Sequence, residues 1–180
     1  MNIAVSPALV PELDPGFVPA VLWNRAYRKA AKDSGAARDV VIALYRPNGT
    51  VSTFATPVLP DTADTRALNV RYVERLVKFL LWMKGGYKVG ICGAPEIAQA
   101  LASVYGPAGA RKFDFEMMGE RIYGRPFEVV ALDTPPESRE IQVRLGGHMD
   151  GCRIGFDLGG SDRKCAAVVD GKVVHTEEVK

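Results

Sequence analysis

The chain has 180 residues, of which 47% are hydrophobic and 24% are charged, the proportions of an ordinary globular protein. Its 23 basic and 21 acidic residues leave a net charge of +2, so the charge predicts neither a nucleic-acid partner nor an anionic membrane. Its 3 cysteines lie far apart without a Cys-x-x-Cys spacing, which predicts reduced thiols rather than a structural zinc site.

We expect neither a leader nor a membrane span. Residues 1–13 lack the basic region and the apolar core that together define a signal peptide. The longest apolar run, residues 79–83, is far too short to cross a bilayer. The sequence therefore predicts a cytoplasmic protein.

The first elements in chain order are an arm, a helix and a hairpin. Residues 1–16 contain prolines and no hydrophobic period, which indicates an extended arm. Residues 17–34 place their apolar side chains on one face, so a helix is expected there. The strands 40–45 and 50–59 flank a Pro-Asn-Gly turn and predict a hairpin. Pro57 places the second of these strands at a sheet edge.

Helices and strands then alternate. A long helix is predicted over residues 65–84, and a short strand over 87–92. Pro95 marks the first turn of the next helix, because its fixed φ suits that position. A further helix is expected through 113–122 and a strand over 126–132.

This order of elements predicts an α/β protein with mixed sheets. Residues 17–132 are expected to form one compact α/β unit, and residues 133–138, with two prolines, form the best linker. Residues 139–180 contain only strands, the first two over 141–145 and 152–158. Three strands without a covering helix are a poor folding unit, so we expect this second unit to be the incomplete start of a larger domain.

The bend that follows the strand ending at Asp157 carries the strongest functional signal. Gly159, Gly160 and Ser161 form this bend, and Lys164 lies on the next strand. Glycines let backbone amides approach an anion closely, and the serine and lysine add a hydroxyl and a cation. A carboxylate can hold Mg²⁺ against the same phosphate. The pattern predicts a phosphate-binding hairpin, although a plain hairpin with a glycine-rich bend has the same residues.

The run of residues 154–164 resembles the first phosphate-binding motif of the actin-like ATPase superfamily, and within it the ROK family most closely. That family typically has aspartate, any residue, two glycines, threonine and lysine. Here Ser161 replaces the threonine and keeps the hydroxyl, while Asp162 and Arg163 are additional residues before Lys164. The resemblance covers residues 151–179.

The resemblance implies that the second unit begins an actin-like, ribonuclease H-like lobe. In that lobe Asp157 would bind Mg²⁺, while Gly159, Gly160, Ser161 and Lys164 would contact the terminal phosphates of ATP. It further implies an ATP-dependent kinase of a sugar or similar small molecule, with a nucleotide and a sugar as partners and homo-oligomers as a compatible state. The catalytic aspartate, sugar pocket and zinc site of such kinases cannot be located in the sequence, so the chain itself should not turn over substrate.

Two readings from other classes stay open. One is a non-catalytic ROK-type regulator or ligand sensor that retains the phosphate hairpin. The other is an independent interaction module over residues 17–132, with a vestigial hairpin behind it. Regulators of this family commonly carry a winged helix-turn-helix in front, and residues 17–132 lack that pattern, which disfavours DNA binding.

Other candidate residues have simpler explanations. The turn at Gly93 lacks the G-x-G-x-x-G spacing, and Pro95 as a helix start accounts for most of it. Cys92 has no histidine near it in the sequence, so it is expected to be a small buried residue. His148 is expected in a solvated turn, and His175 on a strand surface.

Overall fold

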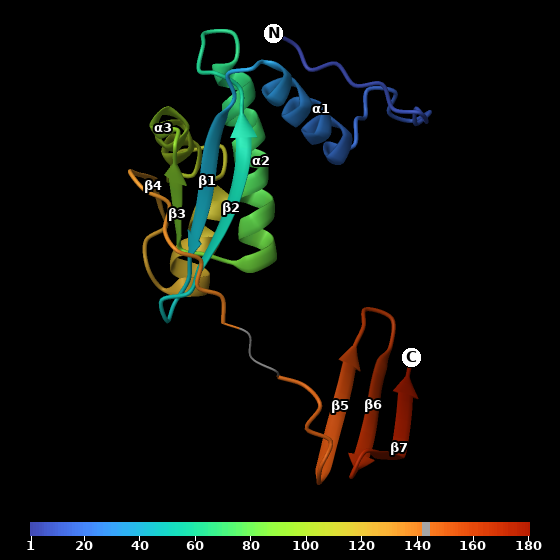
Figure 1. The fold of residues 1–180 in the computed structure, drawn as a ribbon. Coiled ribbons are helices and arrows are strands. Elements are labelled where there is room, and N and C mark those ends of the chain that lie inside the picture. Colours follow the sequence, from blue (N-terminus) through green and yellow to red (C-terminus); the bar gives the residue numbers. More distant parts are fainter. Residues whose placement is uncertain (142–144) are drawn as a thin grey trace. The chain divides into compact units, whose positions relative to one another are not determined.

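A computed structural model of the chain describes residues 1–141 and 145–180. The chain divides into two compact units, the first of which ends at Ile141 (Figure 1). The first unit combines helices with a four-stranded sheet, and the second is a three-stranded sheet. The protein is therefore of mixed α/β class, as predicted. The strand predicted over residues 141–145 falls mostly on positions outside the described residues.

The sheet of the first unit is mixed. Its strands are β1 (Arg38–Tyr45), β2 (Val51–Val58), β3 (Lys88–Cys92) and β4 (Glu128–Leu132), in the spatial order β2-β1-β3-β4. β1 runs antiparallel to both of its neighbours, whereas β3 and β4 are parallel. β2 lies at the edge of the sheet, where Pro57 placed it, because a proline cannot donate to a further strand.

The three longest of the described helices connect these strands or precede them. They are α1 (Ala20–Asp33), α2 (Arg66–Lys84) and α3 (Pro95–Val104). α1 starts later than predicted because Pro19, with ψ 131°, is still extended. Gly85 ends α2 with φ 78°, a conformation that glycine adopts without steric cost.

The helix predicted over residues 113–122 is interrupted. It forms α4 (Lys112–Glu116) and a π-helical turn, η1 (Met117–Arg121). Gly119 inside this turn is non-helical, with φ −93° and ψ −106°. A Cβ at this position would lie 3.1 Å from the Arg125 carbonyl oxygen, so the chain passes closely over itself here. No helix in the described parts of the chain has the length and hydrophobicity that crossing a membrane requires.

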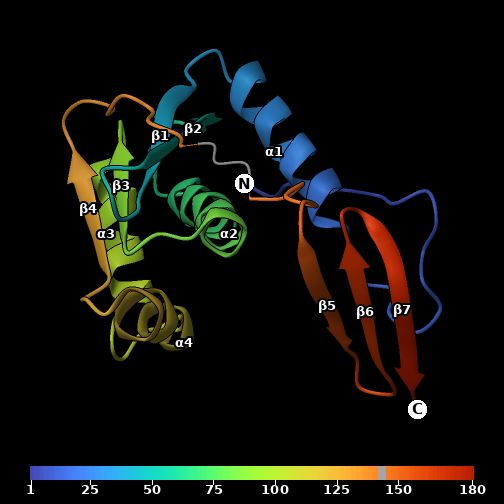
Figure 2. The ribbon, with the colours of Figure 1, turned by 90° about the horizontal axis from the view of Figure 1, so that it is seen from below.

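The core of the first unit lies between one face of the sheet and the helices (Figure 2). The ring of Tyr27 from α1 stacks on Tyr72 from α2, with 4.1 Å between centroids. The Tyr27 hydroxyl donates a hydrogen bond of 2.5 Å to the Asn69 side-chain oxygen, so the polar groups among these rings are paired. Alternate residues of β1 complete the core as almost fully buried side chains: Val40, Ile42 and Leu44.

The second unit is an antiparallel sheet of β5 (Cys152–Leu158), β6 (Arg163–Val169) and β7 (Lys172–Val179), in that order. Asp170 and Gly171 join β6 to β7 with φ values of 48° and 79°, the pair of positive values that a tight two-residue hairpin turn needs. Every residue of β5 and β7 is exposed. The apolar side chains of β5 and β7 are therefore largely uncovered among the described residues, whereas Cys165 to Val168 of the central strand are half-buried.

Candidate functional site

The bend between β5 and β6 consists of residues 159–162 and is open to solvent. The Gly159 amide donates a hydrogen bond of 3.0 Å to the Asp162 carbonyl, so this amide is used inside the bend. Among the described residues, no partner accepts from the Gly160 amide, the Ser161 amide or the Ser161 hydroxyl. The bend thus presents two of the three predicted amides and the hydroxyl to an incoming group.

The two glycines of the bend have different structural roles. A Cβ at Gly159 would lie 2.8 Å from the Asp162 side-chain oxygen, which can rotate away, and 3.2 Å from the Asp162 carbonyl oxygen, a tight approach that favours a residue without a side chain there. A Cβ at Gly160 would meet no atom within 4 Å, and the φ of this residue is not positive. The fold therefore does not need a glycine at position 160, where the missing side chain serves to expose the backbone.

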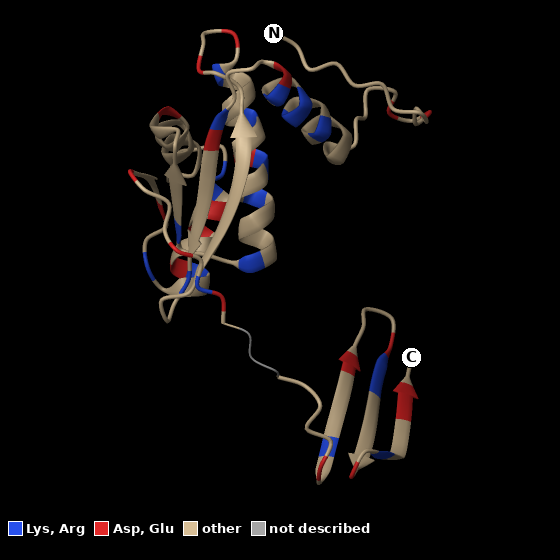
Figure 3. Ribbon diagram, in the orientation of Figure 1, with Lys and Arg blue, Asp and Glu red and all other residues tan. Residues whose placement is uncertain are grey.

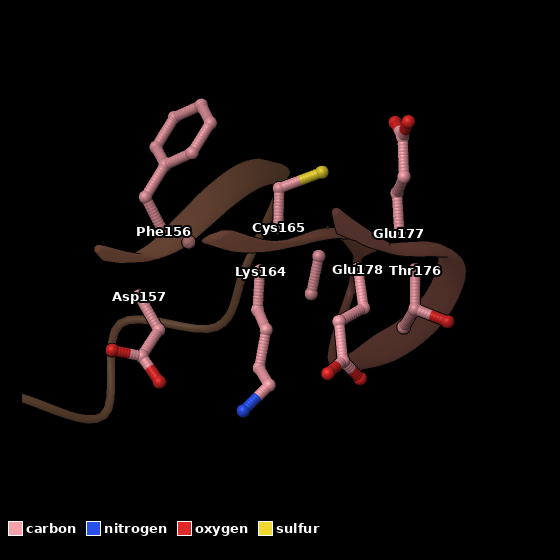
Figure 4. Close-up of a pocket in the computed structure, with 9 residues that line it drawn as sticks. Phe156, Asp157, Lys164, Cys165, Thr176, Glu177 and Glu178 are labelled. Carbon is pink, nitrogen blue, oxygen red and sulfur yellow. The ribbon is translucent and has the colours of Figure 1, made fainter. Parts of the chain in front are cut away.

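A row of charged residues runs across the three strands beside the bend. Asp157 is the register partner of Lys164, which in turn is the partner of Glu178. All three side chains point to the same face of the sheet (Figure 4). The Lys164 ammonium pairs with Asp162 at 3.0 Å. Three carboxylates thus accompany one ammonium, and these four residues carry a net negative charge of two.

This charged row borders a shallow hollow. A parallel row of small residues, Gly155, Ala166 and Thr176, crosses the same face and leaves the backbone uncovered. The two rows line a hollow of about 440 Å³ together with Phe156, Cys165 and Glu177, whose side chains point to the opposite face (Figure 4). The hollow is large enough for part of a small ligand, but among the described residues a single sheet forms its only wall.

The excess of carboxylates near the bend disfavours a bare anion. A free polyphosphate would be repelled by them, whereas a metal–phosphate complex, although anionic overall, would present its cation to them. Among the described residues, no group of three histidine, cysteine or acidic side chains is placed to hold a metal ion. Asp157 fits a Mg²⁺ ion as a single protein ligand, with phosphate and water oxygens completing the coordination.

The two histidines do not contribute to this face. His148 is exposed, and its carbonyl accepts a hydrogen bond of 2.9 Å from the Arg153 side chain. His175 lies on the surface of β7, 4.0 Å from Glu177. Both positions agree with the sequence-based expectation of a solvated turn and a strand surface.

The turn at Gly93 is explained by the fold. Gly93 has φ 87°, and a Cβ there would lie 2.3 Å from the Asp39 carbonyl oxygen of the neighbouring strand. Glu96 in the first turn of α3 pairs with Arg38 at 2.6 Å. Cys92 is buried, as expected. These residues join β3 to α3 and pack the helix against the sheet.

One charged site was missed by sequence reasoning. Glu140 follows the predicted linker, but its carboxylate binds the first unit by accepting hydrogen bonds from Lys84, Ser52 and Arg46 at 2.6 to 2.7 Å. The adjacent Arg139 exchanges two backbone hydrogen bonds with Val51 on the edge of β2. The partners lie 56 to 94 positions away in the sequence, and no local pattern connects them.

Known proteins offer no template for this hairpin. No protein-family model matches the chain, and neither a curated protein nor a solved structure matches it. The resemblance to the ROK family therefore depends on the sequence of residues 154–164 alone.

Proposed function

We propose that the β5–β6 hairpin binds the terminal phosphates of Mg²⁺-ATP in an ATP-dependent kinase of ROK type, which phosphorylates a sugar or a similar small molecule. The observation that carries the proposal is the exposed bend at Gly160 and Ser161, with two amides and a hydroxyl that lack partners among the described residues, next to the carboxylate of Asp157. Backbone amides that converge in a bend are a recurrent way of binding phosphate.

Each residue of the hairpin has a separate task in this proposal. The amides of Gly160 and Ser161 and the Ser161 hydroxyl hold the phosphate oxygens. Asp157 binds Mg²⁺, which neutralises charge on the phosphates and so makes this acidic face accessible to them. Lys164 contacts the phosphate if it gives up its ion pair with Asp162. If it keeps this ion pair, it orients the bend instead of the phosphate.

The chain alone is expected to bind Mg²⁺-ATP weakly and to transfer no phosphate. Nucleotide sites of this kind enclose the ligand between two walls, and the hairpin supplies one. Phosphoryl transfer also needs a base that accepts the proton of the substrate hydroxyl, and no described residue is assigned to that role.

A non-catalytic ROK-type regulator or ligand sensor is the second candidate. The ion pair between Lys164 and Asp162 favours it, because Asp162 is an additional residue relative to the family pattern and occupies the cation. In a form that contains the whole predicted domain, a kinase transfers phosphate from ATP to a sugar, and Asp157→Ala abolishes the transfer. A regulator binds its ligand without transfer.

The hairpin can be tested directly by nuclear magnetic resonance of the ¹⁵N-labelled chain. Millimolar Mg²⁺-ATP should shift the amide signals of Gly160 and Ser161, and ATP with a chelator should shift them less. Asp157→Asn should remove the response. Glu177→Gln is the matched control, because it makes the same change of charge on the opposite face of the sheet (Figure 4). Unchanged Gly160 and Ser161 signals, or an equal loss in both variants, would refute the assignment.

A further inference from the structure

A groove in the first unit has the charge and shape of a second ligand site. It lies between α1 and α2 and has a volume of about 530 Å³. Sites for small molecules typically have ~300–1,000 Å³. The groove lies wholly within residues 1–141, so it is independent of the proposed nucleotide hairpin.

The groove collects more positive than negative charge. Basic residues recur along both helices (Figure 3). Of the four that line the groove, Arg111 pairs with Glu74 at 2.6 Å and Lys78 pairs with Asp114 at 3.4 Å. The other two, Arg28 from α1 and Arg75 from α2, have no carboxylate within ion-pairing distance among the described residues. The excess is two positive charges, both on guanidinium groups.

A polar atom in the groove also lacks a partner. The side-chain oxygen of Asn24 is inaccessible to solvent and accepts no hydrogen bond from any described residue. Asn24 lies one turn before Arg28 on α1, so the two side chains share a face of the helix. A buried acceptor of this kind is costly unless a donor reaches it, so the chain leaves the polar groups beside the groove incompletely paired.

The remaining lining is apolar. Leu76 is buried at the base, while Val21 and Phe79 are 57% and 62% exposed. Exposed apolar side chains beside unpaired guanidinium groups suit a ligand that carries an apolar part and an anionic part. A phosphate monoester carries about two negative charges at neutral pH, which matches the excess of the groove, and guanidinium groups bind its oxygens in pairs.

We propose that the α1–α2 groove binds a small phosphate monoester with an apolar or aromatic portion. Arg28 and Arg75 hold the phosphate, and Val21, Leu76 and Phe79 contact the apolar portion. Lys78 and Arg111 stay in their ion pairs and add to the positive field.

Phenyl phosphate is the probe for this groove, with the ¹⁵N-labelled chain observed by nuclear magnetic resonance. The Arg75 guanidinium lies 5.9 Å from the Trp23 ring centroid, so the Trp23 indole N–H signal reports on the site. Phenyl phosphate should cause saturable shifts of this signal. Inorganic phosphate and benzyl alcohol, which each lack one half of the probe, should bind at least about tenfold more weakly, because the first loses the apolar contact and the second loses the charge-assisted hydrogen bonds.

Substitutions separate the two halves of the site. Arg28→Gln and Arg75→Gln should each weaken phenyl phosphate roughly tenfold. The matched control is Arg25→Gln, which removes an exposed charge of α1 outside the groove and should leave the affinity unchanged. Phe79→Ser should weaken phenyl phosphate but not inorganic phosphate. Well-dispersed spectra of each variant confirm that it is folded.

Several results would overturn the proposal. These are the absence of saturable shifts, equal affinity for inorganic and phenyl phosphate, or an equal loss in the Arg25 and Arg75 variants. Tighter binding of an acidic helical peptide than of phenyl phosphate would assign the groove to protein docking instead. A negative result here leaves the hairpin test untouched, because that test observes Gly160 and Ser161.

Discussion

The carboxylate of Glu140 fastens the end of the first unit to its sheet, and its removal gives the sharpest test of this structure. Its Oε1 accepts hydrogen bonds from Lys84 at 2.7 Å and Ser52 at 2.6 Å, and its Oε2 accepts one from Arg46 at 2.7 Å. Substitution by glutamine keeps the shape of the side chain and removes the charge. Glu140→Gln therefore tests the electrostatic part of this contact alone.

The expected loss can be worked out from the pKa of Glu140. Hydrogen bonds from Lys84, then Ser52 and Arg46, lower this pKa from 4.5 to about 2. A difference of that size corresponds to roughly 3 kcal/mol if it is fully expressed. The side chain is 36% exposed, however, so water screens the charges, and exposed ion pairs contribute only about 0.2–1 kcal/mol each. With two such pairs, we expect Glu140→Gln to lower the free energy of unfolding by about 0.4–2 kcal/mol at pH 7.

The effect should depend on pH with a defined sign. Because the folded-state pKa lies below the ordinary value, the carboxylate stabilises the fold above pH 4.5, and this contribution is lost as the pH falls toward about 2. Urea unfolding at several pH values measures it. Both tryptophans, Trp23 and Trp82, belong to the first unit, so their fluorescence follows the unfolding of that unit alone.

A matched control makes the measurement decisive. Glu137 is 82% exposed and lies 3.8 Å from Arg139, its ion-pair partner among the described residues. Glu137→Gln should change the free energy of unfolding by less than about 0.5 kcal/mol. If Glu140→Gln has no larger effect than this control, or an effect that persists unchanged at pH 2, the reasoning from the contacts of Glu140 is wrong.

Two further substitutions test the packing of the first unit by the same unfolding assay. Gly93→Ala should lower the free energy of unfolding by roughly 3 kcal/mol or more, because its Cβ would lie 2.3 Å from a backbone oxygen at a positive φ. The control is Gly35→Ala, at a positive φ in open space, which should cost about 1 kcal/mol. Equal losses in the two variants would show that the close approach at Gly93 does not affect stability. Tyr27→Phe should cost about 1–3 kcal/mol, because it leaves the buried Asn69 oxygen without its donor, and an unchanged midpoint would contradict that.

The local elements of the fold could be predicted because each depends on neighbours in the sequence. The turn at Asn48 and Gly49 needs two residues that tolerate positive φ, and the sequence supplies them between two apolar runs. The period of α2 and its end at Gly85 are likewise local. Pro57 even fixed the place of β2 in the sheet, because a missing N–H excludes a further strand on that side.

Features that depend on distant residues could not be predicted. The break at Gly119 arises because the chain returns over it at Arg125 and Phe127, and no residue before the break signals that approach. In the sequence, Glu140 looks like a residue of the linker region. Its role is visible only in the folded chain, where Arg46, Ser52 and Lys84 surround its carboxylate. The groove between α1 and α2 could not be predicted for the same reason. Within the sequence of α2 alone, Arg75 is one residue of a polar helix face, and nothing local indicates that α1 packs beside it.

The bend of the candidate site shows how far sequence alone can reach. Gly159 and Gly160 are equivalent in the sequence motif. In the structure they differ in the atoms that a Cβ at each position would meet. At Gly159 this atom would lie 3.2 Å from the Asp162 carbonyl oxygen, so the tight bend itself favours a glycine. At Gly160 it would meet nothing within 4 Å, and the backbone is in a region that any residue adopts. The fold therefore gives no reason for a glycine at position 160, which is compatible with the proposed contact between its bare amide and phosphate.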